Sequence, residues 1–394
     1  MQVTLANWRS SPFNRWAFHH VRELIPSADI ANDPRRIREL PLEKRSLEVR
    51  IDPDSGEGLD LAAFLRETDT DGFAVVHRGK LVFEHYANGM TDATPHILMS
   101  VSKSMLGLLV GELGLDTERQ VTEIIPELRP TAYRGATLRH LLDMRAGIAW
   151  DENYLATSGP IVEYRKATGW NPPGDEVSDL HSFYANLTQS DGPHGGRFHY
   201  TSPNSDLLGW VIERATGARY ADLMSELVWK PAGAERSGYI TVDRLGAPRC
   251  AGGMCVTLRD LARVGQWAME QGKTERFERE GDPQAWAAGD MAPYFPGLPM
   301  RYRSKWYVMD GKAPLAFGVG IHGQNLFVDR INNLVIAKLS SQAMPMDAAE
   351  ANSIRIPIFF IVRPRDGKAG YFGKAKLKTK LPELIATYCR PSTA

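Results

Sequence analysis

A serine and a lysine three residues apart, Ser100 and Lys103, form the only Ser-x-x-Lys in the 394 residues of this chain. Spacing of three places both side chains on one face of a helix, within reach of each other. A serine hydroxyl becomes a strong nucleophile when a neighbouring base accepts its proton, and a lysine can be that base once burial lowers its pKa. The pattern alone is weak, because residue abundances give about one chance Ser-x-x-Lys in a chain of this length.

The surrounding residues predict the element that positions this pair. The run SVSKSMLGLLVGELGLD, which begins at Ser100, is apolar on nearly all sides and contains glycines near its end, so it predicts a buried helix. Ser100 would lie at the helix N-terminus, where free backbone N–H groups and the dipole favour developing negative charge. Burial against Met105 and Leu106 would lower the pKa of Lys103. The position therefore strengthens the prediction that Ser100 is a nucleophile.

Strand patterns lie on both sides of a long helical region. The segment GFAVVHRGKLVFEHYA has two apolar runs around Arg78-Gly79, which predicts a β-hairpin. Near the other end, LAFGVGI, QNLFVDR and LVIAKLSS predict three strands, the last two joined by a turn at Asn332-Asn333. Helical patterns separated by Gly/Pro-rich loops fill most of the sequence between them.

This order of elements predicts an α+β fold, in which a central antiparallel sheet is flanked by helices and receives a mainly helical subdomain. We expect residues 1–124 and 291–394 to form the α/β subdomain that carries the sheet, and residues 125–290 to form the helical subdomain. The chain would be one catalytic unit, with its site in the cleft between the two parts.

Composition excludes several classes of partner. Lys plus Arg and Asp plus Glu both number 47, so the net charge is zero and does not attract nucleic acid or an anionic membrane. The first twenty residues lack the pattern of a signal peptide, no run is long enough to span a bilayer, and three cysteines suit a reducing compartment. The ten histidines form no metal motif. We therefore expect a cytoplasmic protein with a small-molecule substrate, no metal and no cofactor, and the oligomeric state stays open.

Further segments resemble motifs of the serine β-lactamases, DD-peptidases and related esterases. TLRHLLDMRAG, from Thr137, is similar to their T-x-x-H-L-L-x-x-x-S-G segment. YTSPNSDLLGWVIERATG, from Tyr200, matches their Tyr-x-Asn region in spacing, although Ser202 stands at the asparagine position. The resemblance implies that Tyr200 donates a proton to the leaving group and later helps to activate water, work that suits a phenol beside a lysine.

The segment Gly320-Ile321-His322-Gly323 stands where that family carries Lys/His-Thr/Ser-Gly on a strand beside the nucleophile. The resemblance implies an oxyanion hole made by backbone N–H groups, for which we expect those of Ser100 and Ile321. His322 is a candidate for substrate binding. The alternative is an ordinary hydrogen-bonded histidine at the end of a strand.

A closer resemblance is to the 6-aminohexanoate-dimer hydrolases, the nylon-oligomer hydrolase branch of this fold. Shared stretches include NRWAFHHVRELIPSA, LMSVSKS, GWVIERATG, DLARVG, GIHGQNLF and KLSS. The branch implies that Tyr154 is a mobile tyrosine over the substrate and that Trp170 and Tyr307 are pocket walls. The alternative for each is an aromatic residue that fills the core.

Departures from this branch concern the substrate. Its best dimer hydrolases carry an acid where this chain has Arg165. Ala251 stands where a polar residue can help in substrate binding. Tyr307 replaces a tryptophan. We expect short neutral esters to be better substrates than the linear 6-aminohexanoate dimer, because the ammonium end of the dimer would lie near Arg165.

The sequence thus predicts a serine hydrolase that acts through an acyl-enzyme on amides of ω-amino acids or on short carboxylic esters. One alternative is a β-lactamase or DD-peptidase, which the loss of Lys-Thr-Gly and of the Tyr-x-Asn asparagine disfavours. Another is a catalytically silent binding protein on the same fold. A catalytically silent protein on this fold usually lacks the serine, the lysine or the tyrosine, and all three are present in this chain.

Overall fold

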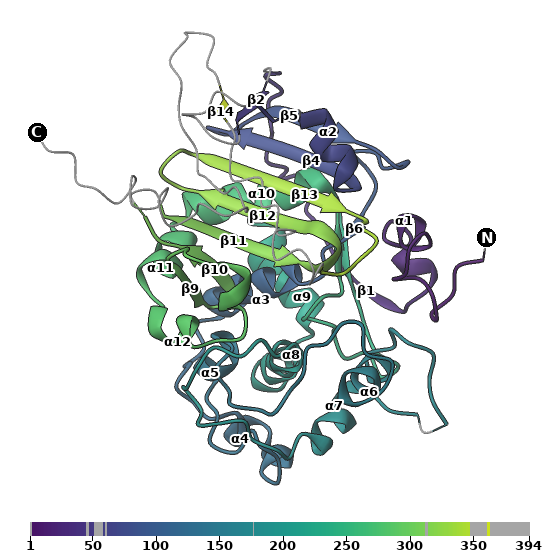
Figure 1. Cartoon of the computed structure of the whole chain (residues 1–394), viewed down its shortest axis with the longest axis vertical. Coiled ribbons are helices and arrows are strands. Elements are labelled where there is room, and N and C mark those ends of the chain that lie inside the picture. The colour runs from purple at the N-terminus through teal and green to yellow at the C-terminus, as the bar shows by residue number, and fades with distance from the viewer. Residues whose placement is uncertain are drawn as a thin grey trace, which may run out of the picture.

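The computed structural model describes residues 2–44, 47–50, 58–59, 61–175, 177–311, 314–346 and 361–362. Its largest sheet has seven strands in the order β5-β4-β13-β12-β11-β10-β9, and every neighbouring pair is antiparallel (Figure 1). The strands are β4 (Thr70–His77), β5 (Lys80–Tyr86), β9 (Met300–Arg303), β10 (Trp306–Met309), β11 (Leu315–Gly320), β12 (Gln324–Asp329) and β13 (Leu334–Ser340). The predicted antiparallel sheet is therefore confirmed, with strands from both ends of the described chain.

Two tight turns form where the sequence predicts them. Arg78 and Gly79 both have positive φ, 52° and 75°, and they join β4 to β5. Two residues with positive φ match the right-handed twist of the strands that they connect. Asn333, with φ 52°, lies in the turn between β12 and β13.

A smaller sheet brings distant segments to the start of the predicted nucleophile helix. Its strands are β1 (Ser27–Ile30), β6 (His96–Ile97), β7 (Gly238–Thr241) and β8 (Met254–Val256), in the order β1-β7-β8-β6. A third sheet contains β2 (Leu47–Arg50), β3 (Gly58–Leu59) and β14 (Ile361–Val362). Because β6 pairs with β8, the chain just before Ser100 lies beside the chain just after Ala251.

The helices divide between the sheet and a separate layer. Near the sheet lie α3 (Val101–Leu113) and α10 (Leu258–Glu270), whereas α4, α5, α6, α7 and α8 gather beyond one end of it (Figure 1). The remaining bounds are α1 (Asn14–Ala17), α2 (Leu61–Glu67), α4 (Val121–Ile124), α5 (Leu138–Leu142), α6 (Pro160–Ala167), α7 (Leu180–Phe183), α8 (Pro203–Thr216), α9 (Tyr220–Met224), α11 (Lys273–Arg279) and α12 (Pro283–Ala287). Within residues 125–290, β7 and β8 belong to the smaller sheet and α10 packs against β4, β12 and β13 of the large one.

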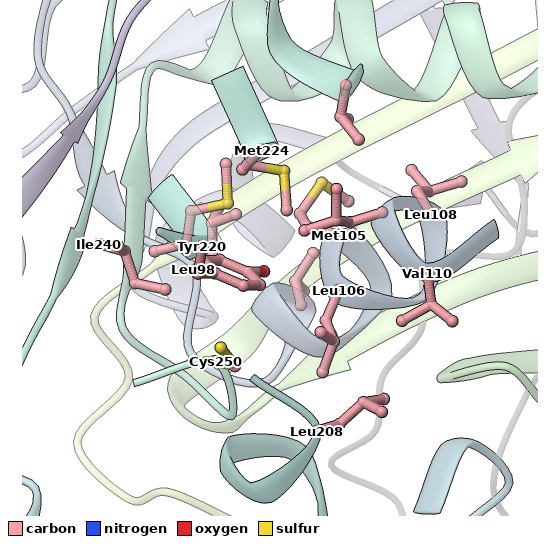
Figure 2. Close-up of a cluster of buried hydrophobic side chains, with 14 of the residues drawn as sticks. Leu98, Met105, Leu106, Leu108, Val110, Leu208, Tyr220, Met224, Ile240 and Cys250 are labelled. Carbon is pink, nitrogen blue, oxygen red and sulfur yellow. The ribbon is translucent and has the colours of Figure 1, made fainter. Parts of the chain in front are cut away.

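The helix after Ser100 runs through the main hydrophobic core. Met105 and Leu106 of α3 are fully buried, and Figure 2 shows them among Leu98, Tyr220 and Met224. This confirms the predicted buried helix, which ends at Gly114 in the left-handed conformation that suits a helix C-terminus. Packing on all sides fixes the position of the residues at its N-terminus. Within the described residues, no helix is both long enough and apolar enough to cross a bilayer.

Candidate active site

Ser100 lies at a sharp turn from strand to helix. It is the N-cap residue of α3, three residues after Ile97, where β6 ends. Met99, between them, is held at a φ of 46°, a left-handed conformation that costs roughly 1–2 kcal/mol for a residue with a Cβ. Its fully buried side chain and the packing of α3 hold this conformation. The turn leaves Ser100 partly exposed while its neighbours on the helix are buried.

Lys103 is placed one helical turn further on, as the spacing predicts. Its Nζ lies 2.7 Å from Ser100 Oγ and donates a hydrogen bond to the Ala251 carbonyl oxygen, also at 2.7 Å. Burial lowers the pKa of Lys103 to about 7, although the negative charge of Glu152 acts in the opposite direction. A large fraction of the lysine is therefore neutral near neutral pH, with a lone pair available for the Ser100 proton.

Tyr200 completes the group of reacting side chains. Asp290 accepts hydrogen bonds from the Tyr200 backbone N–H at 3.2 and 3.1 Å, and the Tyr200 ring centre lies 5.0 Å from Lys103 Nζ. Burial, and then the charge of Glu152, raise the pKa of Tyr200, whereas its side-chain hydrogen bond with Ser100 acts to lower it. The phenol is therefore protonated at neutral pH and can donate its proton.

Glycines bring the end of β11 against the start of α3. A Cβ at Gly318 would lie 2.6 Å from Ser104 Oγ, and a Cβ at Gly320 would lie 3.0 Å from the backbone nitrogen of Ser100. Only glycine permits so close an approach. In the described part of the chain, the Ser100 N–H has no hydrogen-bond acceptor. This N–H and that of Ile321, the residue after β11, are the candidate donors to an oxyanion.

A pocket opens next to Ser100. It encloses about 410 Å³, counted to its open mouth. Its lining residues are Arg9, Met99, Ser100, Glu152, Tyr154, Ile161, Tyr164, Arg165, Trp170, Ser202, Arg249, Ala251, Gly252 and Ile321. This figure includes solvent space at the mouth. Lys103 and Tyr200 are buried beside Ser100 and contribute no part of this lining.

Four of the six predicted substrate-binding residues line this pocket: Tyr154, Arg165, Trp170 and Ala251. Arg165 donates hydrogen bonds to the carbonyl oxygens of Asn153, Tyr154 and Ala156 at 3.4, 2.9 and 3.2 Å. It therefore fixes the loop that carries Tyr154 as well as placing a positive charge beside the pocket. Replacing Arg165 would change both properties at once.

The other two predicted pocket residues, Tyr307 and His322, are not among the residues that line it. Tyr307 on β10 faces a buried aromatic cluster and stacks on Phe317, with 5.5 Å between ring centres. His322 is buried at a φ of 61°, and its Nδ1 lies 2.7 Å from the Gln342 carbonyl oxygen. Neighbouring side chains cover both rings, so the alternatives of core tyrosine and hydrogen-bonded histidine describe them better.

Sequence reasoning missed Glu152, the acid of this pocket. Its carboxylate accepts hydrogen bonds from the backbone N–H and hydroxyl of Ser202, at 2.9 and 2.5 Å, and from Trp150 Nε1 at 2.6 Å. Ser202, which replaces the family asparagine, thus serves as a partner of this acid. No sequence motif surrounds Glu152, and 50 residues separate it from Ser202, so local spacing gave no signal.

Sequence reasoning also missed Asp206, a buried acid that helps to position Lys103. The buried carboxylate of Asp206 accepts hydrogen bonds from Tyr164, from Arg249 and, at 2.7 Å, from the backbone N–H of Ala251. The Ala251 carbonyl is the acceptor for Lys103. Asp206 therefore holds the peptide that positions the lysine amine.

Three residues of the kinds that bind metal ions lie together, away from this pocket. Within the described residues, His19, Asp71 and His96 form one buried group whose ligand atoms lie within 4.8 Å of one another. His96 Nε2 and His19 Nε2 lie 3.2 and 3.6 Å from the same Asp71 oxygen, and Ser341 donates to the other oxygen at 3.1 Å. None of these residues lines the Ser100 pocket. The group joins the N-terminal segment to β4 and β6.

Comparison with known proteins agrees with this geometry. The beta-lactamase family model matches residues 62–357. The chain is 35% identical over 360 residues to a 6-aminohexanoate-dimer hydrolase from Paenarthrobacter ureafaciens, covering 87% of this chain and 89% of that protein. It is 28% identical over 225 residues to the esterase EstB of Burkholderia gladioli, covering 51% and 54%.

A solved Bacillus anthracis structure, provisionally assigned as a 6-aminohexanoate-dimer hydrolase, superposes with a TM-score of 0.79 at 26% identity and covers 90% of this chain and 96% of that one. The fold is thus β-lactamase/transpeptidase-like, with antiparallel sheets flanked by helices, as the sequence predicts. By sequence and by structure, this chain belongs to the beta-lactamase family.

Proposed function

We propose that this protein is a serine hydrolase that cleaves small amides or esters through an acyl-enzyme on Ser100. The 2.7 Å contact between Ser100 Oγ and Lys103 Nζ, at a serine that lines a pocket, carries the proposal. Its relatives named as an amide hydrolase and an esterase support the class of substrate. Short carboxylic esters and amides of ω-amino acids are the substrates that we expect.

The reaction follows from the positions of the protons. Neutral Lys103 accepts the Ser100 proton while Oγ attacks the substrate carbonyl carbon, and the N–H groups of Ser100 and Ile321 stabilise the resulting oxyanion. Tyr200, a protonated phenol, donates to the leaving alcohol or amine as the intermediate collapses. Water then attacks the acyl-enzyme and gives a proton to the Tyr200 phenolate. The bond between Ser100 Oγ and the acyl carbon breaks as protonated Lys103 returns its proton to Oγ, and the carboxylic acid is released.

A fluorophosphonate probe should label Ser100. Ser102 and Ser104 are buried, and their hydroxyl oxygens are engaged with the Met254 N–H and the Lys305 carbonyl, both at 3.1 Å. Peptide mass spectrometry should place the adduct on Ser100, and Ser100→Ala should show none. An adduct on Ser102 or Ser104, or no adduct on a protein that hydrolyses esters, would contradict the proposal.

Activity should depend on the ionisation of Lys103. Because only the neutral amine accepts a proton, log kcat/KM for a neutral ester should rise with pH below about 7 and level off above it, since burial lowers the lysine pKa to about 7. Glu152 raises this pKa, so Glu152→Gln should move the midpoint to lower pH. The control is Glu163→Gln, an exposed acid on α6 that pairs with Lys166.

Two results would speak against this assignment of the base. One is a profile that falls with rising pH through the same range. The other is a midpoint that moves equally in the Glu152 and Glu163 variants, because only the first of these acids lies in the pocket. A chromogenic cephalosporin measured beside the esters tests the β-lactamase alternative.

A further inference from the structure

Three arginines and one acid line the pocket beside Ser100. The arginines are Arg9, Arg165 and Arg249, and the acid is Glu152. Arg249 is paired, because its guanidinium donates to the buried carboxylate of Asp206 beneath the pocket. Together, three positive and two negative side chains leave one positive charge in excess at this site.

The excess charge resides on Arg9 and Arg165. Neither forms an ion pair with any acid among the residues that the structure describes. Arg165 donates to backbone carbonyls. Arg9 donates from Nη2 to Asn171 Oδ1 at 2.6 Å, and its buried Nε has no acceptor. The charge of Glu152 acts on Arg165, but the Glu152 oxygens accept hydrogen bonds from Ser202 and Trp150 and form no ion pair with either arginine.

Arg9 is held rigidly in this position. Its guanidinium carbon lies 5.6 Å from the ring centre of Trp8 and 5.9 Å from that of Trp170, a pocket wall. Trp8 is fixed in turn by a hydrogen bond from its Nε1 to the Trp170 carbonyl at 2.9 Å. A guanidinium that packs beside two indoles and is hydrogen-bonded to Asn171 is preorganised for an anion, because little side-chain entropy remains to be lost.

The electrostatic environment of Arg9 favours an anion. Burial, and then repulsion by Arg165 and Arg249, lower the pKa of Arg9 to about 9. An incoming carboxylate beside the guanidinium would relieve this repulsion. The same positive charges would repel an ammonium group.

We propose that Arg9, assisted by Arg165, is a carboxylate subsite, and that the preferred substrates are esters or amides with a carboxylate remote from the scissile carbonyl. This inference rests on the proposed hydrolysis at Ser100. It extends the expectation that Arg165 disfavours the ammonium end of the dimer, because the positive field that repels an ammonium group attracts a carboxylate. Arg9 belongs to the N-terminal segment, in which the sequence offered no catalytic pattern.

Matched ester pairs test the proposal. The first pair is p-nitrophenyl butyrate and the p-nitrophenyl hemi-ester of glutaric acid, which carries a carboxylate on the acyl side. The second pair is phenyl butyrate and 4-carboxyphenyl butyrate, which carries it on the leaving group. A charge-assisted hydrogen bond predicts a kcat/KM about 10- to 100-fold higher for the anionic member of at least one pair. The preference should lie mainly in KM and shrink as salt is added.

Arg9→Met should abolish this preference, measured as the ratio of kcat/KM between the anionic and neutral member of each pair, and Arg9→Lys should retain part of it. Arg36→Met, at an exposed arginine of the same N-terminal region, is the matched control and should keep the full preference. Free glutarate should inhibit neutral-ester hydrolysis by the unmodified protein, whereas glutaramide should not. This measurement needs no variant and so does not depend on how Arg9→Met folds.

The outcomes separate the two proposals. If no ester of either pair is hydrolysed, the proposed function fails. If neutral and anionic esters are hydrolysed equally well and glutarate does not inhibit, the hydrolase stands and the carboxylate subsite is wrong. A preference that survives in a folded Arg9→Met protein would also overturn the assignment to Arg9.

Discussion

Lys103→Met should lower kcat/KM for ester hydrolysis by about 10⁴-fold, at the upper end of what a positioned general base contributes. Methionine has nearly the length of lysine and no basic nitrogen, so Ser100 Oγ would lose the base that lies 2.7 Å away. The acylation step should suffer most, because it requires removal of the serine proton. Stopped-flow labelling by the fluorophosphonate probe measures that step directly.

Lys305→Met is the matched control. Lys305 is also a fully buried lysine, and its Nζ donates to the Leu141 carbonyl at 2.6 Å, outside the Ser100 pocket. The same substitution there removes a buried amine without removing the proposed base, so kcat/KM should change little. Circular dichroism and thermal melting check that both variants fold. Comparable losses of activity in two folded variants would show that Lys103 contributes through burial alone.

Tyr200→Phe should lower kcat by about 10²- to 10⁴-fold with little change in KM, because the phenol acts when protons move. Burial raises the pKa of Tyr200 and keeps it protonated, so its main role is to donate to the leaving group. The loss should therefore be larger for alkyl esters and amides than for p-nitrophenyl esters, whose leaving group needs no proton. Steady-state kinetics across a series of leaving groups measures this dependence.

Tyr302→Phe is the control for this substitution. Tyr302 lies on β9 in the aromatic cluster next to Tyr200 and is also buried, so the two variants remove the same atom from similar surroundings. We expect nearly normal kcat in Tyr302→Phe. A Tyr200→Phe protein with normal kcat and a raised KM would instead make Tyr200 a contributor to binding only.

The reacting pair could be predicted from the sequence because its geometry is local. A helix places residues i and i+3 on one face, so Ser-x-x-Lys at the start of an apolar run predicts the contact between Ser100 and Lys103. The hairpin at Arg78-Gly79 is local in the same sense, since two adjacent residues determine the turn. Tyr200 required the family resemblance, because its distance from Ser100 along the chain is 100 residues and no local rule joins them.

The tertiary structure decided those walls of the pocket that no sequence pattern indicated. Glu152 meets Ser202, and Arg9 meets Asn171, across 50 and 162 residues of intervening chain. Such contacts depend on how loops pack over the sheet, which spacing along the chain does not encode. The same applies to Tyr307, an aromatic residue equally suited to a pocket or a core, which the packing of β10 places in the core. Helical periodicity in the sequence predicted the contact between Ser100 and Lys103, whereas long-range packing determined which charged side chains line the pocket.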